Sequence, residues 1–281
     1  MTISILPTGA PVGAQVLGID LSKPLNSATF SAIERAFNEY GVIFFRDQDL
    51  TPCQQIDFTR RFGELDYNVF SKTRGLPGVP EIILITNILK GGEPIGLQRA
   101  GEQWHTDMCY TARPPRGSIL YAHEVPQLAG MTLGDTCFAS TCAAYDALPE
   151  AMRKRIDGLR ATFSFRARKR GFVVTEAQTA AYPDVVHSLV RRHHKTGRAC
   201  IYAMRGDCTA IDGMHDSDAS VLIAALAEHI TRPEFVYRHR WRVGDLLMWD
   251  NCSVQHKAIQ DYALPLRRLM HRTTIVGTTT Q

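Results

Sequence analysis

The most constraining feature of the sequence is an alternating stretch close to its C-terminal end. Between residues 235 and 242, one set of side chains is aromatic or histidine, and the other is Val236 followed by arginines at every second position. Successive side chains of a strand point to opposite faces, so this period of two predicts a strand with one buried face. Val243-Gly244-Asp245 then turns the chain into an apolar strand over 246–249.

The rest of the chain repeats this pattern of short apolar segments separated by turns. Further strands are expected over 15–21, 42–45, 81–86, 116–125, 134–139, 159–165, 187–192, 198–204 and 268–276. Helices are expected from Ser27 to Gly41, from Thr51-Pro52 to Gly63, near 140–157 and from Asp216 to Ile230, whereas 90–102 is expected to be loop. Many short strands with few helices predict a barrel or sandwich, here as one domain over 1–281.

The composition indicates the class of protein and the compartment in which we expect it. The chain has 281 residues, of which 44% are hydrophobic and 21% charged, as in ordinary globular proteins. No apolar run approaches the ~20 residues that span a bilayer, and the N-terminal segment resembles no secretory signal. The seven cysteines form no CxxC pair, which favours reduced thiols. We therefore expect a cytoplasmic protein without a membrane partner.

The charge balance argues against nucleic acid as a partner. The net charge is only +4, because 32 Lys and Arg face 28 Asp and Glu. Two basic clusters, at 166–170 and 191–195, fit solvated loops or an anion-binding mouth better than a nucleic-acid stripe. A homo-oligomer is compatible with the sequence, which identifies no interface.

A candidate metal site begins at Gln103-Trp104-His105-Thr106-Asp107. In an extended segment, His105 and Asp107 point to the same face, and a neutral imidazole with a carboxylate supplies two ligands of a facial triad for Fe(II). His256 can be the third, if 254–258 is a strand. Taken alone, each pattern is more often structural: a His bonded to a nearby Asp, or a satisfied core His.

Two arginines near the C-terminal end favour the metal site over a purely structural role. Arg268 and Arg272 share one face of the strand expected over 268–276, together with Met270. Arg is almost never buried without a partner, so two on one face beside an iron site indicate a dicarboxylate ligand. The alternative is an edge strand with solvated arginines.

These motifs, in this order, resemble one enzyme family. WHTD at 104–107, GDT at 134–136, FVYRHRW at 235–241, GDLLMWDN at 244–251, His256 and RRLMHRTT at 267–274 are similar to the taurine dioxygenase and 2,4-dichlorophenoxyacetate dioxygenase family. Its members are Fe(II)- and 2-oxoglutarate-dependent oxygenases. The resemblance covers nearly the whole chain.

The resemblance implies a mainly β fold with flanking helices, the double-stranded β-helix or jelly roll. It places His105, Asp107 and His256 on the iron-ligand positions. It places Arg272 and Thr136 on the distal carboxylate of 2-oxoglutarate, with Arg268 as a second arginine near this cosubstrate. The implied reaction consumes O2 and 2-oxoglutarate and yields succinate, CO2 and a hydroxylated substrate.

The resemblance also bears on the substrate. The family's taurine enzymes anchor taurine with a His, a Tyr and an Asn at positions that here read Asn68, Ser71 and Gly101, so we expect taurine to be a poor substrate. Candidate residues for an aromatic wall or an anion anchor are Tyr67, Phe70, Phe163, Phe165 and Arg205, each of which could equally be packing or solvated. We expect a small organic acid, aromatic or aryloxyalkanoate-like.

Two rival interpretations remain open at this point. One is a sulfonate or alkylsulfate dioxygenase of the same family. The other is a non-catalytic β-barrel protein that binds a metal and a small anion. A simple metal-binding barrel has no need for a dicarboxylate clamp, so Arg272 and Thr136 discriminate between the enzyme and the barrel.

Overall fold

The centre of the computed structural model, which describes residues 3–67, 71–168 and 175–277, is a sandwich of two sheets. The larger sheet contains β1 (Ser4–Pro7), β2 (Ala14–Leu17), β3 (Val42–Phe45), β4 (Gly75–Leu76), β5 (Val79–Thr86), β8 (Gly117–Glu124), β18 (Leu246–Asp250) and β20 (Leu269–Ile275). Their spatial order is β1-β2-β3-β18-β8-β20-β5-β4, and only β2 and β3 pair in parallel. The smaller sheet has the order β17-β11-β19, formed by Val236–His239, Thr136–Ser140 and Val254–Ala258.

The core that holds the two sheets together comes from the alternating strands. Phe138 and Trp249 are buried between the sheets, and Trp241 lies with them just beyond β17. The alternation expected over 235–242 is confirmed, because Phe235, His239 and Trp241 are buried whereas the arginines between them are exposed. This interior is where the candidate site lies.

Two helices cover the outer face of the larger sheet. Helix α1 (Ser27–Tyr40) begins at Asn26, whose side chain accepts from the backbone of Thr29, and ends at Gly41 in the left-handed conformation. Helix α2 (Pro52–Arg60) begins with a capping box formed by Thr51 and Gln54. Both helices pack apolar side chains against the sheet, as the sequence predicts, although the cap of α1 is Asn26 and not Ser27.

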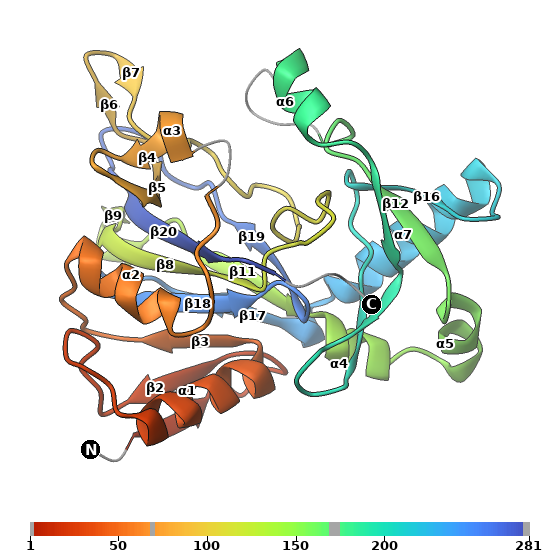
Figure 1. Ribbon diagram of the computed structural model, residues 1–281, viewed down its shortest axis with the longest axis horizontal. Coiled ribbons are helices and arrows are strands. Elements are labelled where there is room, and N and C mark those ends of the chain that lie inside the picture. The colour runs from red at the N-terminus through yellow and green to blue at the C-terminus, as the bar shows by residue number, and fades with distance from the viewer. Residues whose placement is uncertain (1–2, 68–70, 169–174, 278–281) are drawn as a thin grey trace.

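A lobe inserted between β11 and β17 has its own core, and Figure 1 shows it on the side of the sandwich opposite α1 and α2. Its helices are α4 (Thr141–Asp146), α5 (Glu150–Ile156), α6 (Glu176–Ala181) and α7 (Asp216–Ile230), followed by the 3₁₀ turn η1 (Pro233–Phe235). Its strands are β12 (Arg160–Phe163), β13 (Val185–Ser188), β14 (Val190–Arg192), β15 (Ala199–Ile201) and β16 (Cys208–Ile211).

The remaining elements are short. A helical turn α3 (Ser71–Arg74) precedes β4, and two small hairpins are formed by β6 (Leu89–Lys90) with β7 (Glu93–Pro94) and by β9 (Gln127–Leu128) with β10 (Met131–Thr132). The hairpin at 89–94 corrects the expectation of a plain loop from residue 90. Within the described ranges, no helix has the length and apolar character needed to cross a bilayer.

Candidate active site

Three buried side chains converge inside the sandwich. His105, Asp107 and His256 each offer a ligand atom, and these atoms all lie within 4.8 Å of one another. Asp107 Oδ1 is 3.7 Å from His105 Nε2 and 3.8 Å from His256 Nε2. An octahedral ion with bonds of about 2.1 Å separates adjacent ligand atoms by about 3 Å, so a small contraction of this group would surround one ion.

Backbone pairing brings the two histidines together. The amide of His105 donates to the carbonyl of His256 at 3.1 Å, and the amide of His256 donates to the carbonyl of His105 at 2.8 Å. Directly opposed residues of an antiparallel pair project their side chains to one face, so the rings lie 4.1 Å apart. The segment 103–107 is therefore extended only at this single bridge and forms no strand.

Neighbouring residues orient these side chains. His105 Nδ1 lies 2.8 Å from the carbonyl of Gln103, which favours the tautomer whose free Nε2 faces Asp107. Ser118 donates to Asp107 Oδ2 at 2.6 Å, and the amide of Asp107 donates to Asn251 Oδ1 at 3.3 Å. The sequence reasoning missed Ser118 and Asn251, which have no signal beyond their places on β8 and just after β18.

The electrostatics of the group suit a metal cation. Burial by itself raises the pKa of Asp107, but Arg272 and the two histidines together hold it well below its ordinary value. Burial and the neighbouring His105 lower the pKa of His256 well below its ordinary range. The group thus combines a carboxylate with an imidazole kept neutral, which is the form that binds a metal. These residues fit an Fe(II) ion.

Arg272 lies directly against this group. Its Nη1 is 3.5 Å from Asp107 Oδ1, the same oxygen that faces both histidines. Its Nε is buried and has no hydrogen-bond partner in the described structure. Asp66, which the sequence reasoning did not single out, is close enough for its charge to interact with Arg272 and Asp107; burial raises the pKa of Asp66.

Arg268 occupies a separate pocket. It is only 3% exposed, and its Nε has no partner among the residues that the structure describes. Its guanidinium carbon lies 5.9 Å from the ring centre of Trp241, whose indole N–H donates to Thr136 Oγ1 at 3.0 Å. Tyr262 is its hydrogen-bonding neighbour. Gly134 borders the pocket, since a Cβ there would come within 3.2 Å of Arg268 Nε.

The residues considered for the substrate are dispersed. Tyr67 is 56% exposed and its hydroxyl bonds to Glu81, so it faces solvent. Phe163 and Phe165 are fully buried in the core of the inserted lobe and line no surface, which corrects the expectation of an aromatic wall from these two. Ser71 is buried, with an unpartnered hydroxyl. Two further candidates, Asn68 and Phe70, lie outside the described residues.

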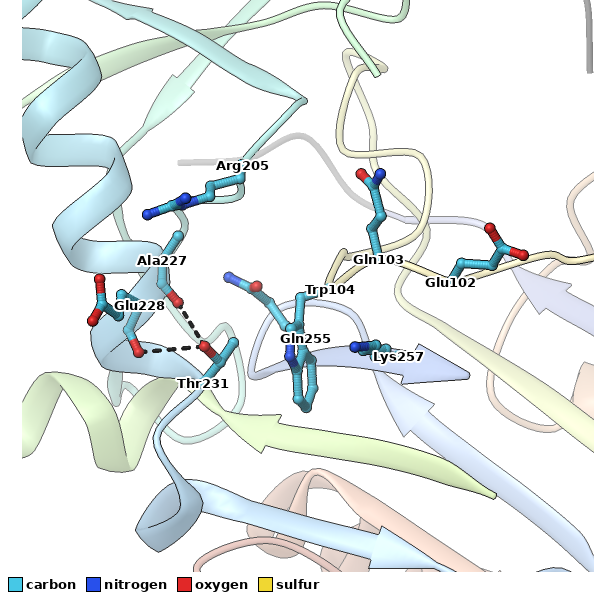
Figure 2. Close-up of a pocket in the computed structure, with 9 residues that line it drawn as sticks. All are labelled: Glu102, Gln103, Trp104, Arg205, Ala227, Glu228, Thr231, Gln255 and Lys257. Atoms are coloured by element: carbon cyan, nitrogen blue, oxygen red, sulfur yellow. Dashed lines mark hydrogen bonds between the residues drawn. The ribbon is translucent and has the colours of Figure 1, made fainter. Parts of the chain in front are cut away.

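Arg205 lines a different cavity. This cavity of about 630 Å³ is bordered by α7, the segment before His105 and the face of β19 opposite His256; its lining residues are Glu102, Gln103, Trp104, Arg205, Ala227, Glu228, Thr231, Gln255 and Lys257. Figure 2 shows Gln255 and Trp104 between Arg205 on one side and Lys257 on the other. None of the three converging ligands is among these residues.

Gly101, another substrate candidate, lies against a converging ligand. It has φ +80, and a Cβ built on it would lie 3.1 Å from His105 Cε1. We expect Gly101→Ala to lower the free energy of unfolding by about 1–2 kcal/mol because of the left-handed backbone. The added methyl group also pushes against the ring of His105, so Fe(II) affinity should fall. Denaturant unfolding and a metal titration measure the two effects; unchanged values in both would contradict this contact.

Comparison with known proteins agrees with this geometry. The family described as "Taurine catabolism dioxygenase TauD, TfdA family" matches residues 4–274. The chain is 36% identical to the alpha-ketoglutarate-dependent 2,4-dichlorophenoxyacetate dioxygenase of Cupriavidus pinatubonensis, over 98% of both chains. It is 31% identical to the alpha-ketoglutarate-dependent sulfate ester dioxygenase of Pseudomonas putida, over 99% of this chain and 90% of that one.

A solved structure is also similar to this chain. The crystal structure of AAD-2 in complex with Mn(II) and N-oxalylglycine superimposes with a TM-score of 0.83 at 31% identity, and it covers 100% of this chain and 99% of that one. The two facing sheets are thus the jelly roll that the sequence led us to expect. The chain belongs to the TauD, TfdA family and is an Fe(II)- and 2-oxoglutarate-dependent dioxygenase that uses O2.

Proposed function

We propose that this dioxygenase hydroxylates a small organic acid of the aryloxyalkanoate class and that Arg272 holds the carboxylate of this substrate. The observation that carries the proposal is the position of Arg272, whose Nη1 lies 3.5 Å from Asp107 Oδ1 while its Nε has no partner in the described structure. A cation at this place fixes an anionic substrate beside the reacting centre. The 36% identity to a 2,4-dichlorophenoxyacetate dioxygenase supports the substrate class.

In this proposal, His105, Asp107 and His256 hold the iron. When bound, Fe(II) supplies the redox chemistry that couples decarboxylation of 2-oxoglutarate by O2 to oxidation of the substrate. Ser118 and Asn251 fix the carboxylate and backbone of Asp107, so that one oxygen stays directed at the two histidines. The buried ring of Trp249, whose centre is 4.7 Å from that of His256, keeps water from the back of this imidazole.

We further propose that Arg268 and Thr136 bind the distal carboxylate of 2-oxoglutarate, which reverses the roles that the resemblance suggested for the two arginines. Two methylene groups separate the distal carboxylate from the end of 2-oxoglutarate that chelates a metal. An arginine in contact with Asp107 is therefore too close to the metal to reach the distal carboxylate. Arg268 is four residues away along the strand, about 13 Å, and shares its pocket with Thr136 through Trp241.

The burial of Arg268 independently supports this role. A guanidinium at 3% exposure is rarely stable without a counter-charge, and no carboxylate of the described chain forms an ion pair with it. Burial accordingly lowers the pKa of Arg268, against the opposing effect of Tyr262. A dicarboxylate cosubstrate supplies the missing negative charge.

We expect taurine to be used poorly. Taurine is a strongly hydrated zwitterion, and a site that binds it must replace its hydrogen bonds to water. Here Gly101 offers no side chain and Ser71 is shorter than the Tyr of taurine enzymes. Two missing contacts at ~1–3 kcal/mol each predict roughly 30- to 25,000-fold poorer use. Succinate formation from taurine, relative to an aryloxyacetate, measures this; efficient turnover of taurine would contradict it.

A substrate panel tests the proposed class. The Fe(II) enzyme is incubated with 2-oxoglutarate, O2 and, in turn, an aryloxyacetate, a 2-aryloxypropionate, an alkyl sulfate and no substrate, and succinate is measured. We expect the aryloxy acids to exceed the no-substrate control by the widest margin. Preference for the alkyl sulfate would replace the proposal by the second candidate, which the 31% identity to a sulfate ester dioxygenase supports.

We also propose that residues 1–281 act as one domain, and that the protein is a cytoplasmic homo-oligomer. Its partners in this proposal are small molecules, without nucleic acid or membrane. The near balance of 32 basic and 28 acidic residues supports the absence of a nucleic-acid partner. Light scattering after size-exclusion chromatography tests the proposed homo-oligomer. A measured mass near that of one chain would refute it.

A further inference from the structure

Three buried cysteines lie together at the junction of the sandwich and the inserted lobe. Cys142 belongs to α4, Cys200 to β15 and Cys252 to the turn between β18 and β19, and they form a cluster of their own. The sulfur atoms of Cys142 and Cys200 are 2.8 Å apart. All seven cysteines of the chain are free thiols, and this is where two of them are in contact.

The approach needed for a bond is small. A disulfide has an S–S length of about 2.05 Å, so these sulfurs would move only about 0.8 Å closer. Cys142 and Cys200 come from elements between which α5, β12, α6, β13 and β14 intervene, and both cysteines are buried in packed structure. Their contact is therefore a property of the fold and not of a loose chain.

Cys142 borders a small crevice. The crevice measures about 10 Å³, enough for about one water-sized molecule, and Cys142 lines it together with His193, Ser140 and Ser253. Cys200 and Cys252 are not among the residues that line it, so Cys142 is the member that an entering molecule meets.

The third cysteine, Cys252, lies against Cys200. The thiol of Cys200 is hydrogen-bonded to Cys252, and together with the charge of Arg191 this bond lowers the pKa of Cys252. Asp250 fixes the turn, because its Oδ1 accepts from the amides of Cys252 at 2.7 Å and Ser253 at 2.9 Å.

We propose that Cys142 and Cys200 are a redox-modifiable pair that a hydroperoxide converts to a disulfide. Hydrogen peroxide oxidises the Cys142 thiol to the sulfenic acid and releases one water. The sulfur of Cys200 attacks the sulfur of Cys142 and displaces hydroxide. The thiol proton of Cys200 leaves with this hydroxide as a second water. In sum, two thiols and one peroxide give one disulfide and two waters.

The bond would join α4 to β15 within the inserted lobe. Helix α4 directly follows β11, the strand that carries Thr136 and pairs with the strand of His256. Strand β15 belongs to the inserted lobe. A cross-link between residues 142 and 200 closes a long loop, so we expect the melting temperature to rise by roughly 5–15 °C on oxidation.

The test uses the full chain loaded with Mn(II) in place of iron, so that peroxide reacts with thiols and not with Fe(II). After peroxide treatment, the thiol count of the denatured protein should fall by two from the seven in the sequence, and the mass should fall by two hydrogens. A non-reducing digest should contain one cross-linked peptide that joins Cys142 to Cys200. Dithiothreitol should restore the thiols and the original melting temperature.

Single variants complete the test. Cys142→Ala and Cys200→Ala should each abolish the cross-link, whereas Cys208→Ala, which is also buried but lies outside the cluster, should retain it. A thiol count that stays at seven would overturn the proposal. It would equally be overturned by a cross-link that joins Cys200 to Cys252, by one between molecules through exposed Cys53, or by thiols protected by a bound zinc ion.

Discussion

His256→Ala will bind Fe(II) more than 100-fold more weakly than the wild type and will show no measurable turnover. Loss of a residue that only orients a ligand already costs about 10- to 100-fold in metal affinity, and His256 supplies a ligand atom itself. The fold should persist, because the backbone amide of residue 256 still pairs with the carbonyl of His105. Anaerobic metal titration and succinate formation measure the two effects.

A matched variant separates this loss from a general effect of removing a histidine. His229 on α7 is half-buried, and its Nε2 lies 2.8 Å from the carbonyl of Ala144 in the inserted lobe. His229→Gln should keep its iron and its activity. Normal iron content and turnover in His256→Ala would refute the assignment of the ligands.

Arg268→Lys will raise the concentration of 2-oxoglutarate needed for half-maximal activity about 10- to 150-fold. Lysine keeps the positive charge but cannot form the bidentate pair, so about one charge-assisted hydrogen bond of ~1.5–3 kcal/mol is lost. Fe(II) affinity should hardly change, because the Arg268 pocket is formed by Trp241, Tyr262 and Gly134 and by none of the ligands. Steady-state kinetics with varied 2-oxoglutarate provide the measurement.

The other arginine is the natural control. Arg272→Lys should weaken use of the organic acid substrate and leave the dependence on 2-oxoglutarate nearly unchanged, because Arg272 lies against Asp107 and not in the Arg268 pocket. The reverse pattern, with 2-oxoglutarate affected only by Arg272→Lys, would restore the roles implied by the family resemblance and reject those proposed here.

The strands that carry the site could be predicted because their burial alternates. Strand β19 places Val254 and His256 toward the interior while Gln255 reaches the opposite side and donates to the carbonyl of Ala203. Helix α2 and strand β3 could also be predicted from the sequence. The signal for α2 is Thr51-Pro52, and the signal for β3 is four consecutive apolar residues. Such signals are local, so a single sequence contains them.

The parts that could not be predicted depend on contacts between distant segments. Ser118 supports Asp107 from β8, and Asn251 supports it from the turn after β18, far away in the sequence. Phe165 is as aromatic as a substrate-contacting residue would be, and only the packing of the inserted lobe shows that it is core. Arg205 follows a strand whose orientation toward α7 is set by that same lobe.

Arg268 and Arg272 show the same limit of prediction from sequence, here for two residues of one segment. Alternation correctly predicts that Met270 and Arg272 point into the sandwich, since Met270 is fully buried there. It says nothing about which arginine is nearer to Asp107. That distance depends on how β20 lies along β8, where the register shifts between Leu269 and Met270.

The most direct test of the proposed site is an anaerobic titration of the Fe(II) protein with 2-oxoglutarate, followed by the weak visible absorption that develops when the 2-oxo acid chelates the iron. We predict a saturable absorption in the wild type and no absorption in His256→Ala. The curve should shift about 10- to 150-fold to higher concentration in Arg268→Lys and stay unshifted in Arg272→Lys. Wild-type curves for both His256→Ala and Arg268→Lys would contradict the proposed site.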